Sequence, residues 1–293
     1  MDVAAEPGDP GPGEPHGRWI RSVGAPRMVP ARVTLWLRNR CRPLALAATS
    51  RIVDGWHAAS NLLFPPACTF CGGEMAPQTP MLCAACVALL SGPTPAACGR
   101  CAHPLPRHWS ERQWCPRCRG RRYHFDRAVA LGCYRADLRQ AVLRMKRPTA
   151  EPLTHSMGLL LGNHLRETTL GQPADCVVPV PMHWNRRLHR GTNTALILGA
   201  AVGKCLGRPC LGRLLRCRHK TRKQGTLRPA ERFVNVRDAF RVSTGYDITE
   251  ARVLLIDDIM TTGATLSEAA KELRRGGARS VEVAVVARGT GAL

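Results

Sequence analysis

Apolar positions in the second half of the chain follow the pattern of strands that alternate with helices. Four short runs are apolar at nearly every position, which is typical of strands buried on both faces of a parallel sheet. These runs cover residues 127–134, 175–181, 253–256 and 281–287. We expect helices over residues 137–146, 153–167, 194–206 and from Thr265 to Arg275. The alternation predicts an α/β fold with a parallel sheet flanked by helices.

The first part of the chain predicts little packed structure. Residues 1–17 are rich in Pro, Gly and acids, and we expect residues 1–50 to form a disordered or variable extension. The apolar run 43–50 is too short for a membrane span and lies late for a signal peptide, so no transmembrane segment is expected. Apolar residues then recur on one helical face, which predicts a docking helix over 51–66, with a membrane-surface helix as the alternative. They are Ile52, Trp56, Ala59 and Leu63.

Eight cysteines form four C-x-x-C pairs within residues 67–120. The pairs are Cys68 and Cys71, Cys83 and Cys86, Cys98 and Cys101, and Cys115 and Cys118. The spacing suits tetrahedral zinc, and few large apolar residues lie nearby, so metal binding should supply much of the folding free energy. Disulfides and redox pairs are the alternatives; the lack of an export signal disfavours disulfides, and four redox motifs in a row would be unusual. We expect two structural Zn²⁺ sites paired in chain order, although a cross-braced arrangement is also possible.

The chain carries 43 Lys and Arg against 21 Asp and Glu, a net charge of +22. Such an excess favours anionic partners, which include polyphosphates, nucleic acid and acidic lipid, although compositional bias could produce part of it. The most basic stretch is 214–241, with Arg216, Arg218, Lys220, Arg222, Lys223, Arg228, Arg232, Arg237 and Arg241. This stretch could close over a bound polyphosphate, hold a nucleic-acid backbone, or be a solvated loop.

The candidate chemistry is concentrated after the strand at 253–256. Asp257 and Asp258 follow it, and such acids suit a ribose diol or a Mg²⁺ shell. The loop of Thr261, Thr262, Gly263, Ala264 and Thr265 can wrap a phosphate with its N–H groups at the start of a helix. A phosphate cup beside a diol acceptor describes a site for a sugar phosphate.

A second basic loop follows the strand at 175–181. Its guanidinium groups suit a pyrophosphate, because Arg forks pair with phosphate oxygens. The candidates are Arg186, Arg187, Arg190 and Gly191. The carboxyl ends of parallel strands share one edge, so this loop and Asp257 should border one crevice. A solvated basic loop is the alternative. Lys146, which ends a helix before Pro148, could likewise lie near a phosphate or merely interact with the helix dipole.

The run Asp258–Thr265 resembles the phosphoribosyl pyrophosphate (PRPP) motif of type I phosphoribosyltransferases. The chain also has the zinc pairs, a V-P-V-P strand, an R-G-x-N loop, an R-x-x-x-x-T-x-x-Q segment at 216–224 and an N-V-x-x-A-F segment at 235–240. With these motifs in this order, it resembles the ComF family over about residues 61–289. The family's R-G-F-N-Q is R-G-T-N-T here, at residues 190–194.

The resemblance implies a type I phosphoribosyltransferase-like domain over 121–293, a small N-terminal double zinc-ribbon module and a cytoplasmic protein. It assigns Asp257 and Asp258 to the ribose, Thr261–Thr265 to the 5′-phosphate and residues 187–193 to the pyrophosphate of Mg²⁺-PRPP. It also implies a role in DNA uptake, with competence helicase and recombination proteins as partners.

Two hypotheses follow. In the first, the protein is a phosphoribosyltransferase, an enzyme that transfers a pentosyl group to a nitrogen acceptor. In the second, it is a non-catalytic module that binds single-stranded DNA or a nucleotide. Aromatic residues make up only 5% of the chain, so stacking platforms for bases are few: Trp109, Trp114 and Tyr123.

Overall fold

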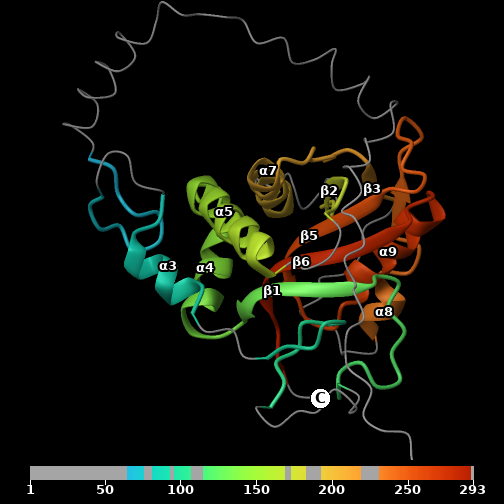
Figure 1. The fold of residues 1–293 in the computed structure, drawn as a ribbon, viewed down its shortest axis with the longest axis horizontal. Coiled ribbons are helices and arrows are strands. Elements are labelled where there is room, and N and C mark those ends of the chain that lie inside the picture. The colour runs from blue at the N-terminus through green and yellow to red at the C-terminus, as the bar shows by residue number, and fades with distance from the viewer. Residues whose placement is uncertain are drawn as a thin grey trace, which may run out of the picture.

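The computed structural model of the 293-residue chain describes residues 65–75, 81–92, 96–106, 115–168, 173–182, 193–218 and 231–291. A sheet of four parallel strands lies at its centre, in the order β1-β6-β5-β2. The strands are β1 (Arg127–Cys133), β2 (Cys176–Pro179), β5 (Arg252–Met260) and β6 (Ser280–Arg288). All four lie on the predicted apolar runs, and Figure 1 shows them side by side between layers of helices.

Strand β5 is longer than its apolar run. The hydrophobic pattern ends at Ile256, but the strand continues to Met260. Its outer neighbour β2 stops at Pro179, opposite Ile256, whereas β6 pairs with β5 as far as Met260. Polar residues are therefore tolerated at the end of β5, because one side of the strand has no further partner strand there.

Three helices cover one face of the sheet: α4 (Ala136–Met145), α5 (Glu151–Thr168) and α7 (Thr194–Leu206). Each lies within a few residues of its predicted range. Helices α5 and α7 pack closely, since a Cβ atom added at Gly158 would lie 2.6 Å from the Cβ of Ala201. Their apolar sides bury Leu254 and Ile256 of β5.

The other face is covered by α9 (Ala264–Arg275) and by an antiparallel pair, β3 (Leu215–Cys217) and β4 (Phe240–Val242). The short helix α8 (Glu231–Asn235) packs against α9. We did not predict β3, β4 or α8 from the basic stretch. Each strand has three residues, of which one is buried, so no period of two can be recognised in the sequence.

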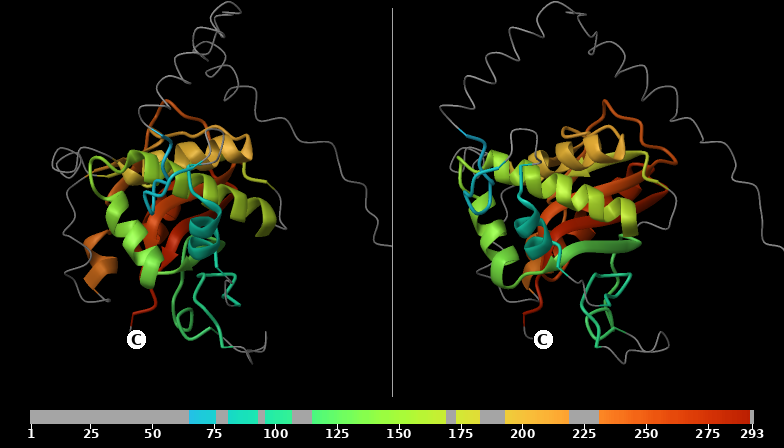
Figure 2. Two further views of the ribbon diagram at one scale, coloured as in Figure 1. Left: turned by 90° about the vertical axis from the view of Figure 1, so that its left-hand side faces the viewer. Right: turned by 60° about the vertical axis from the view of Figure 1, so that its left-hand side comes forward.

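The two cysteine-rich segments lie on opposite faces of the sheet. The first, with α3 (Ala84–Leu90), packs Cys68, Phe70 and Cys86 against the core of α4 and α5. The second packs Cys101, Cys115 and Cys118 into the core that contains α9. Figure 2 shows the first segment, in blue, beside α5 and the second, in green-blue, beyond β1. Each segment thus completes a different core of the α/β domain.

The predicted extension 1–50 and most of the docking helix 51–66 lie outside the described residues. None of the helices within the described ranges combines the length and the apolar character that a membrane crossing requires.

Candidate functional site

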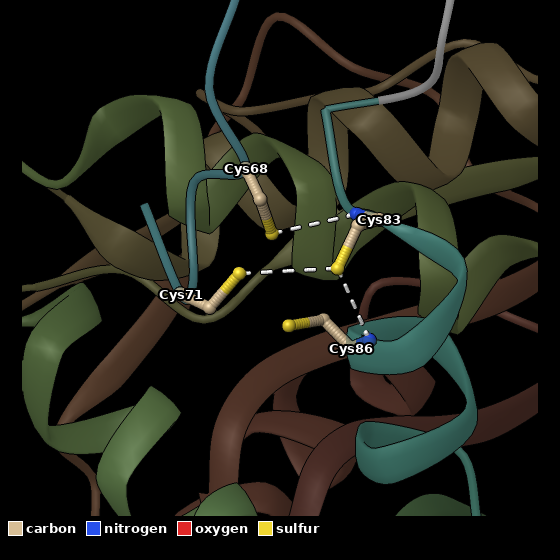
Figure 3. Close-up of side chains that lie close together, drawn as sticks. All are labelled: Cys68, Cys71, Cys83 and Cys86. Atoms are coloured by element: carbon tan, nitrogen blue, oxygen red, sulfur yellow. Dashed lines mark hydrogen bonds between the residues drawn. The ribbon is translucent and has the colours of Figure 1, made fainter. Parts of the chain in front are cut away.

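The first group of cysteines has the geometry of a tetrahedral metal site. The sulfur atoms of Cys68, Cys71, Cys83 and Cys86 all lie within 4.8 Å of one another, and Figure 3 shows them pointing at one common point. The Cys71 and Cys83 sulfurs are 3.9 Å apart. Zinc–sulfur bonds of about 2.3 Å in a tetrahedron separate the sulfurs by about 3.8 Å. A disulfide would need about 2.05 Å, so these residues fit Zn²⁺.

The second group repeats this geometry in chain order, with Cys98, Cys101, Cys115 and Cys118 together. Two sulfur–sulfur distances, Cys98 to Cys118 and Cys101 to Cys115, are both 3.8 Å. The pKa of Cys101 is lowered to about 5, mainly by a hydrogen bond with Cys118. Burial raises this pKa, whereas the charge of Arg288 lowers it further. A thiolate at Cys101 suits a metal ligand. His103 and His124 belong to neither group.

The paired acids lie at the carboxyl end of β5, beyond the last residue of β2. Asp257 pairs in register with Val285 of β6, and the Asp258 amide donates to the Asp257 carboxylate over 2.9 Å. Because side chains alternate along a strand, Asp258 shares the face of Leu254 and Ile256. That face carries α4, and Lys146 at the end of α4 places its Nζ 3.4 Å from Oδ2 of Asp258.

The two carboxylates differ in their environments. Burial raises the pKa of Asp257 well above its ordinary value, and the charge of Asp258 raises it further. Asp258 has the ammonium group of Lys146 beside it. The Lys146 ion pair therefore connects α4 to the acids, and it places a cation at this edge of the sheet.

The threonine loop forms the turn from β5 into α9. Gly263 is the residue before the helix and has a φ of 80°, a left-handed conformation that favours glycine. A Cβ atom there would lie 2.9 Å from Cε of Met260 and 3.0 Å from a ring carbon of Tyr123. Thr261 is exposed, and Thr262 and Thr265 are half-buried. The loop thus brings its backbone and its hydroxyl groups to the edge where Asp257 and Asp258 lie.

Three side chains from distant parts of the sequence hold this loop. Arg232 of α8 donates to the Thr261 hydroxyl over 3.1 Å, and the Tyr123 hydroxyl donates to the Thr262 carbonyl over 3.1 Å. The buried Arg288 donates to the carbonyls of Met260 and Thr261. The sequence indicated Arg232 as part of the basic stretch and Tyr123 only as a ring for base stacking. It did not indicate that Tyr123 and Arg288 support the loop, because isolated residues have neither spacing nor periodicity.

The predicted pyrophosphate residues Arg186, Arg187, Arg190 and Gly191 lie outside the described residues. The strand that leads to them is described, and the Val180 amide donates to the Ile256 carbonyl over 2.9 Å. The chain that leaves β2 is therefore hydrogen-bonded to Ile256, the residue before Asp257.

The ends of the basic stretch form an exposed cationic pair. Arg216 of β3 and Arg241 of β4 are directly opposite each other, and both are exposed. Like charges in this arrangement repel each other. An anion bound between the two guanidinium groups would offset that repulsion. The middle of the stretch, residues 219–230, is outside the described ranges.

Two known protein families match separate parts of the chain. Residues 59–119 match the double zinc ribbon domain, and residues 220–292 match the phosphoribosyl transferase domain. Competence protein F of Haemophilus influenzae is 28% identical over 180 residues, which are 60% of this chain and 79% of that protein. The chain is a relative of competence protein F. The resemblance found in the sequence motifs is thereby confirmed.

The DNA utilization protein YhgH of Escherichia coli K12 is 27% identical over 172 residues, which are 58% of this chain and 75% of that protein. Among solved structures, the purine phosphoribosyltransferase of Pyrococcus horikoshii matches 45% of this chain and 70% of its own, at 19% identity and a TM-score of 0.29. The predicted fold class, a phosphoribosyltransferase-like sheet with a double zinc ribbon, is confirmed by the strand arrangement and the two domain matches.

Proposed function

We propose that this relative of competence protein F binds Mg²⁺-PRPP and transfers its phosphoribosyl group to a nitrogen acceptor. The observation that carries this proposal is the position of Asp257 and Asp258. They lie on the part of β5 that continues past the end of β2, and Ile259 and Met260 connect them to the Thr261–Thr265 loop. A diol acceptor is therefore adjacent in space and sequence to a turn that can hold a phosphate.

The arrangement of the acids constrains how the ligand lies. Asp257 and Asp258 point to opposite faces of the sheet, because they are successive strand residues. A ribose that uses both must lie across the end of β5 and not along one face. Its 5′-phosphate then reaches the start of α9, and its pyrophosphate extends toward the exit of β2, where Arg186, Arg187 and Arg190 follow in the sequence.

Lys146 extends this charge arrangement. In the protein without ligand its ammonium group pairs with Asp258 at 3.4 Å. A ribose hydroxyl that donates to Asp258 would compete with this contact. The flexible stem of lysine then allows Nζ to turn toward the pyrophosphate, whose charge is larger than that of one carboxylate. Lys146 would thus pair with Asp258 before binding and neutralise the leaving group afterwards.

In the proposed reaction a nitrogen atom of the acceptor attacks the anomeric carbon of the ribose. The bond from that carbon to the pyrophosphate oxygen breaks, pyrophosphate leaves with the electron pair, and the proton on the nitrogen passes to water. The carboxylates stabilise the positive charge that develops on the ribose, and the arginines stabilise the leaving group. Mg²⁺ bound to the pyrophosphate would supply further neutralisation of its charge. The two zinc groups are structural, because four thiolates close each site.

Pyrophosphate release tests this proposal. The zinc-loaded protein is incubated with Mg²⁺-PRPP and a panel of nitrogenous bases, beside the variant Asp257→Asn/Asp258→Asn. We expect release by the parent with at least one base and none by the variant, because asparagine cannot stabilise the developing charge. A matched variant, Asp137→Asn/Asp247→Asn, removes two acids elsewhere and should behave as the parent. Equal release by the parent and the Asp257/Asp258 variant would refute the assignment.

A second candidate function is binding of single-stranded DNA, which the exposed pair of Arg216 and Arg241 favours. The names of both relatives refer to competence or to DNA utilization. On that basis we propose a cytoplasmic role in DNA uptake, with competence helicase and recombination proteins as partners. Base stacking on Tyr123 is disfavoured, because that ring is buried and stacks on Phe125.

Fluorescence anisotropy with a labelled oligonucleotide tests this second function. The variant Arg216→Gln/Arg241→Gln should weaken binding and lower the slope of log affinity against log salt by about 1.4, since each phosphate contact on a single strand contributes about 0.7. The control Arg139→Gln/Arg166→Gln removes two arginines from helices α4 and α5 and should not change the slope. An unchanged slope in the first variant would exclude this pair as the DNA contact.

A further inference from the structure

We propose that the second zinc ribbon positions the phosphate loop, so that metal occupancy at Cys98, Cys101, Cys115 and Cys118 controls the affinity of the loop for its ligand. The second ribbon is defined here as residues 96–106 and 115–120, and the phosphate loop as residues 261–265. The inference deepens the proposed function, and it rests on that function for the identity of the ligand. The coupling itself rests on contacts between the ribbon and the loop.

Arg288 connects the ribbon directly to the loop. Its Nε donates to the carbonyl of the zinc ligand Cys101 over 2.7 Å. Its Nη1 donates to the Met260 carbonyl over 2.9 Å, to the Gly289 carbonyl over 2.6 Å, and to the Thr261 carbonyl. One guanidinium group therefore holds a metal ligand and the first residue of the loop at the same time.

The environment of Arg288 makes this connection rigid. The residue is 1% exposed, and within the described ranges no carboxylate lies at ion-pair distance from it. Its buried charge is satisfied by backbone carbonyls alone. Because an unsatisfied buried charge is costly, movement of the Cys101 carbonyl must be compensated by movement of the remaining acceptors. Those acceptors include the first residue of the loop.

Tyr123 makes a second connection from the segment that follows the ribbon. Its hydroxyl donates to the Thr262 carbonyl over 3.1 Å, and its ring lies 3.0 Å from the position of a Cβ atom at Gly263. The Arg100 guanidinium, between two zinc ligands, lies 5.8 Å from the centre of the same ring. The ring thus contacts both the loop and the ribbon.

The second ribbon is also attached to β1 and to the segment that follows β6. The Ala128 amide of β1 donates to the Gly99 carbonyl over 3.2 Å, and Arg117 donates to the Thr290 carbonyl over 3.3 Å. Cys101, Cys115 and Cys118 share one core with Met260, which precedes the loop, and with Ala264, which lies within it. Loss of the metal would release the thiolates into this core, and the loop would lose two of its supports.

The first ribbon offers a natural control, because it docks elsewhere. Its contacts go to α4 and α5: Arg144 donates to the Phe70 carbonyl, and the Thr69 and Ser156 hydroxyls are 3.1 Å apart. Among the described residues it makes no hydrogen bond to the phosphate loop. Removal of the metal from the first ribbon should therefore disturb α4 and α5 without exposing residues 261–265.

Hydrogen–deuterium exchange separates these two outcomes. The variant Cys98→Ser removes a ligand of the second group, and Cys71→Ser removes a ligand of the first. We expect Cys98→Ser to accelerate exchange in peptides that cover residues 260–268 by at least about tenfold, a larger effect than one lost hydrogen bond gives, while Cys71→Ser leaves these peptides at the parent rate. Equal rates in both variants, whether fast or slow, would overturn the proposal. This comparison needs no PRPP, so it remains decisive if the proposed function fails.

A milder variant tests the connection in a fully folded protein. Tyr123→Phe removes one hydroxyl and keeps the ring, and we expect about three- to tenfold weaker binding of Mg²⁺-PRPP in calorimetric titration, the loss of one hydrogen bond. Exchange in residues 260–268 should rise while the zinc content stays at the parent value and the melting temperature falls by no more than about 5 °C. Tyr134→Phe, on the opposite face, serves as the control. If Tyr123→Phe binds Mg²⁺-PRPP with the affinity of the parent, Tyr123 is not a positioning residue.

Discussion

Asp257 is a carboxyl group whose charge the folded protein disfavours. Burial and the neighbouring Asp258 raise its pKa, so the folded state binds a proton more tightly than the unfolded chain does. Stability from this group is fully present below the unfolded pKa of about 3.9 and is lost as the pH rises through the raised folded value. The acid is thus maintained at a cost, as is common for residues that bind ligands.

The replacement Asp257→Asn removes this pH dependence. We expect the melting temperature of the variant to exceed that of the parent, by a margin that grows as the pH rises from about 4 through the raised pKa. Thermal unfolding over a series of pH values measures the margin. Asp137→Asn on α4 should not show such a growing difference. A margin that stays constant or shrinks with rising pH would mean that Asp257 is not destabilised by its charge.

Gly263 combines a left-handed backbone with close neighbours. Gly263→Ala should lower the free energy of unfolding by about 1–3 kcal/mol, because alanine is strained at a φ of 80° and its Cβ would meet the Tyr123 ring. It should also weaken binding of Mg²⁺-PRPP. Chemical denaturation measures the first effect. Gly245→Ala is the control, since no atom lies within 4 Å of a Cβ there. Equal stability of both variants would contradict the strain at the loop.

Among the elements, those with long periodic patterns could be predicted from the sequence. The four strands of the sheet and helices α4, α5, α7 and α9 lie where their apolar residues indicated. The end of β5 could not be predicted, because its last residues are held by pairing with β6 rather than by hydrophobicity. The antiparallel pair of β3 and β4 was missed for a related reason: its strands have three residues each, and β4 is stabilised by contact with α9, which no local pattern records.

Helix α4 is held at its C-terminal end by the first ribbon. The Arg144 guanidinium lies 5.2 Å from the centre of the Phe70 ring and donates to the carbonyls of Thr69 and Phe70. Arg144→Ala should lower the free energy of unfolding by about 1–3 kcal/mol, as expected for lost hydrogen bonds to a charged group and a lost cation–π contact. Denaturant unfolding measures this loss. Arg139→Ala, on the exposed side of the same helix, should change stability by less than about 0.5 kcal/mol. A similar small effect for Arg144→Ala would show that the ribbon does not brace α4.

At the scale of the whole molecule, the sequence predicted both parts but not how they are joined. The C-x-x-C spacing indicated two metal groups, and the structure brings the cysteines together in chain order. It did not indicate that the two ribbons lie on opposite faces of the sheet, because spacing within a ribbon contains no information on where the ribbon docks. In the candidate site, the paired acids and the threonine loop were recognisable as one contiguous motif. Tyr123, Lys146 and Arg288 are distant from this motif in the sequence and reach it through tertiary contacts.

Since each ribbon contributes cysteines to a core of the α/β domain, we expect the zinc-loaded protein to unfold in one cooperative transition. Removal of zinc by a chelator should lower the midpoint by more than about 10 °C, because structural zinc contributes on the order of 10 kcal/mol. Differential scanning calorimetry with and without chelator measures this shift. The appearance of a separate low-temperature transition, with the main transition unchanged, would show that the ribbons are independent of the sheet.

The central claim, a sugar-phosphate site at the end of β5, is tested most directly by calorimetric titration of the zinc-loaded protein with Mg²⁺-PRPP beside the variant Asp257→Asn/Asp258→Asn. The account predicts saturable binding by the parent and no detectable binding by the variant, with both proteins folded and carrying equal zinc. Absence of binding by the folded parent, or equal affinity in the two proteins, would contradict it.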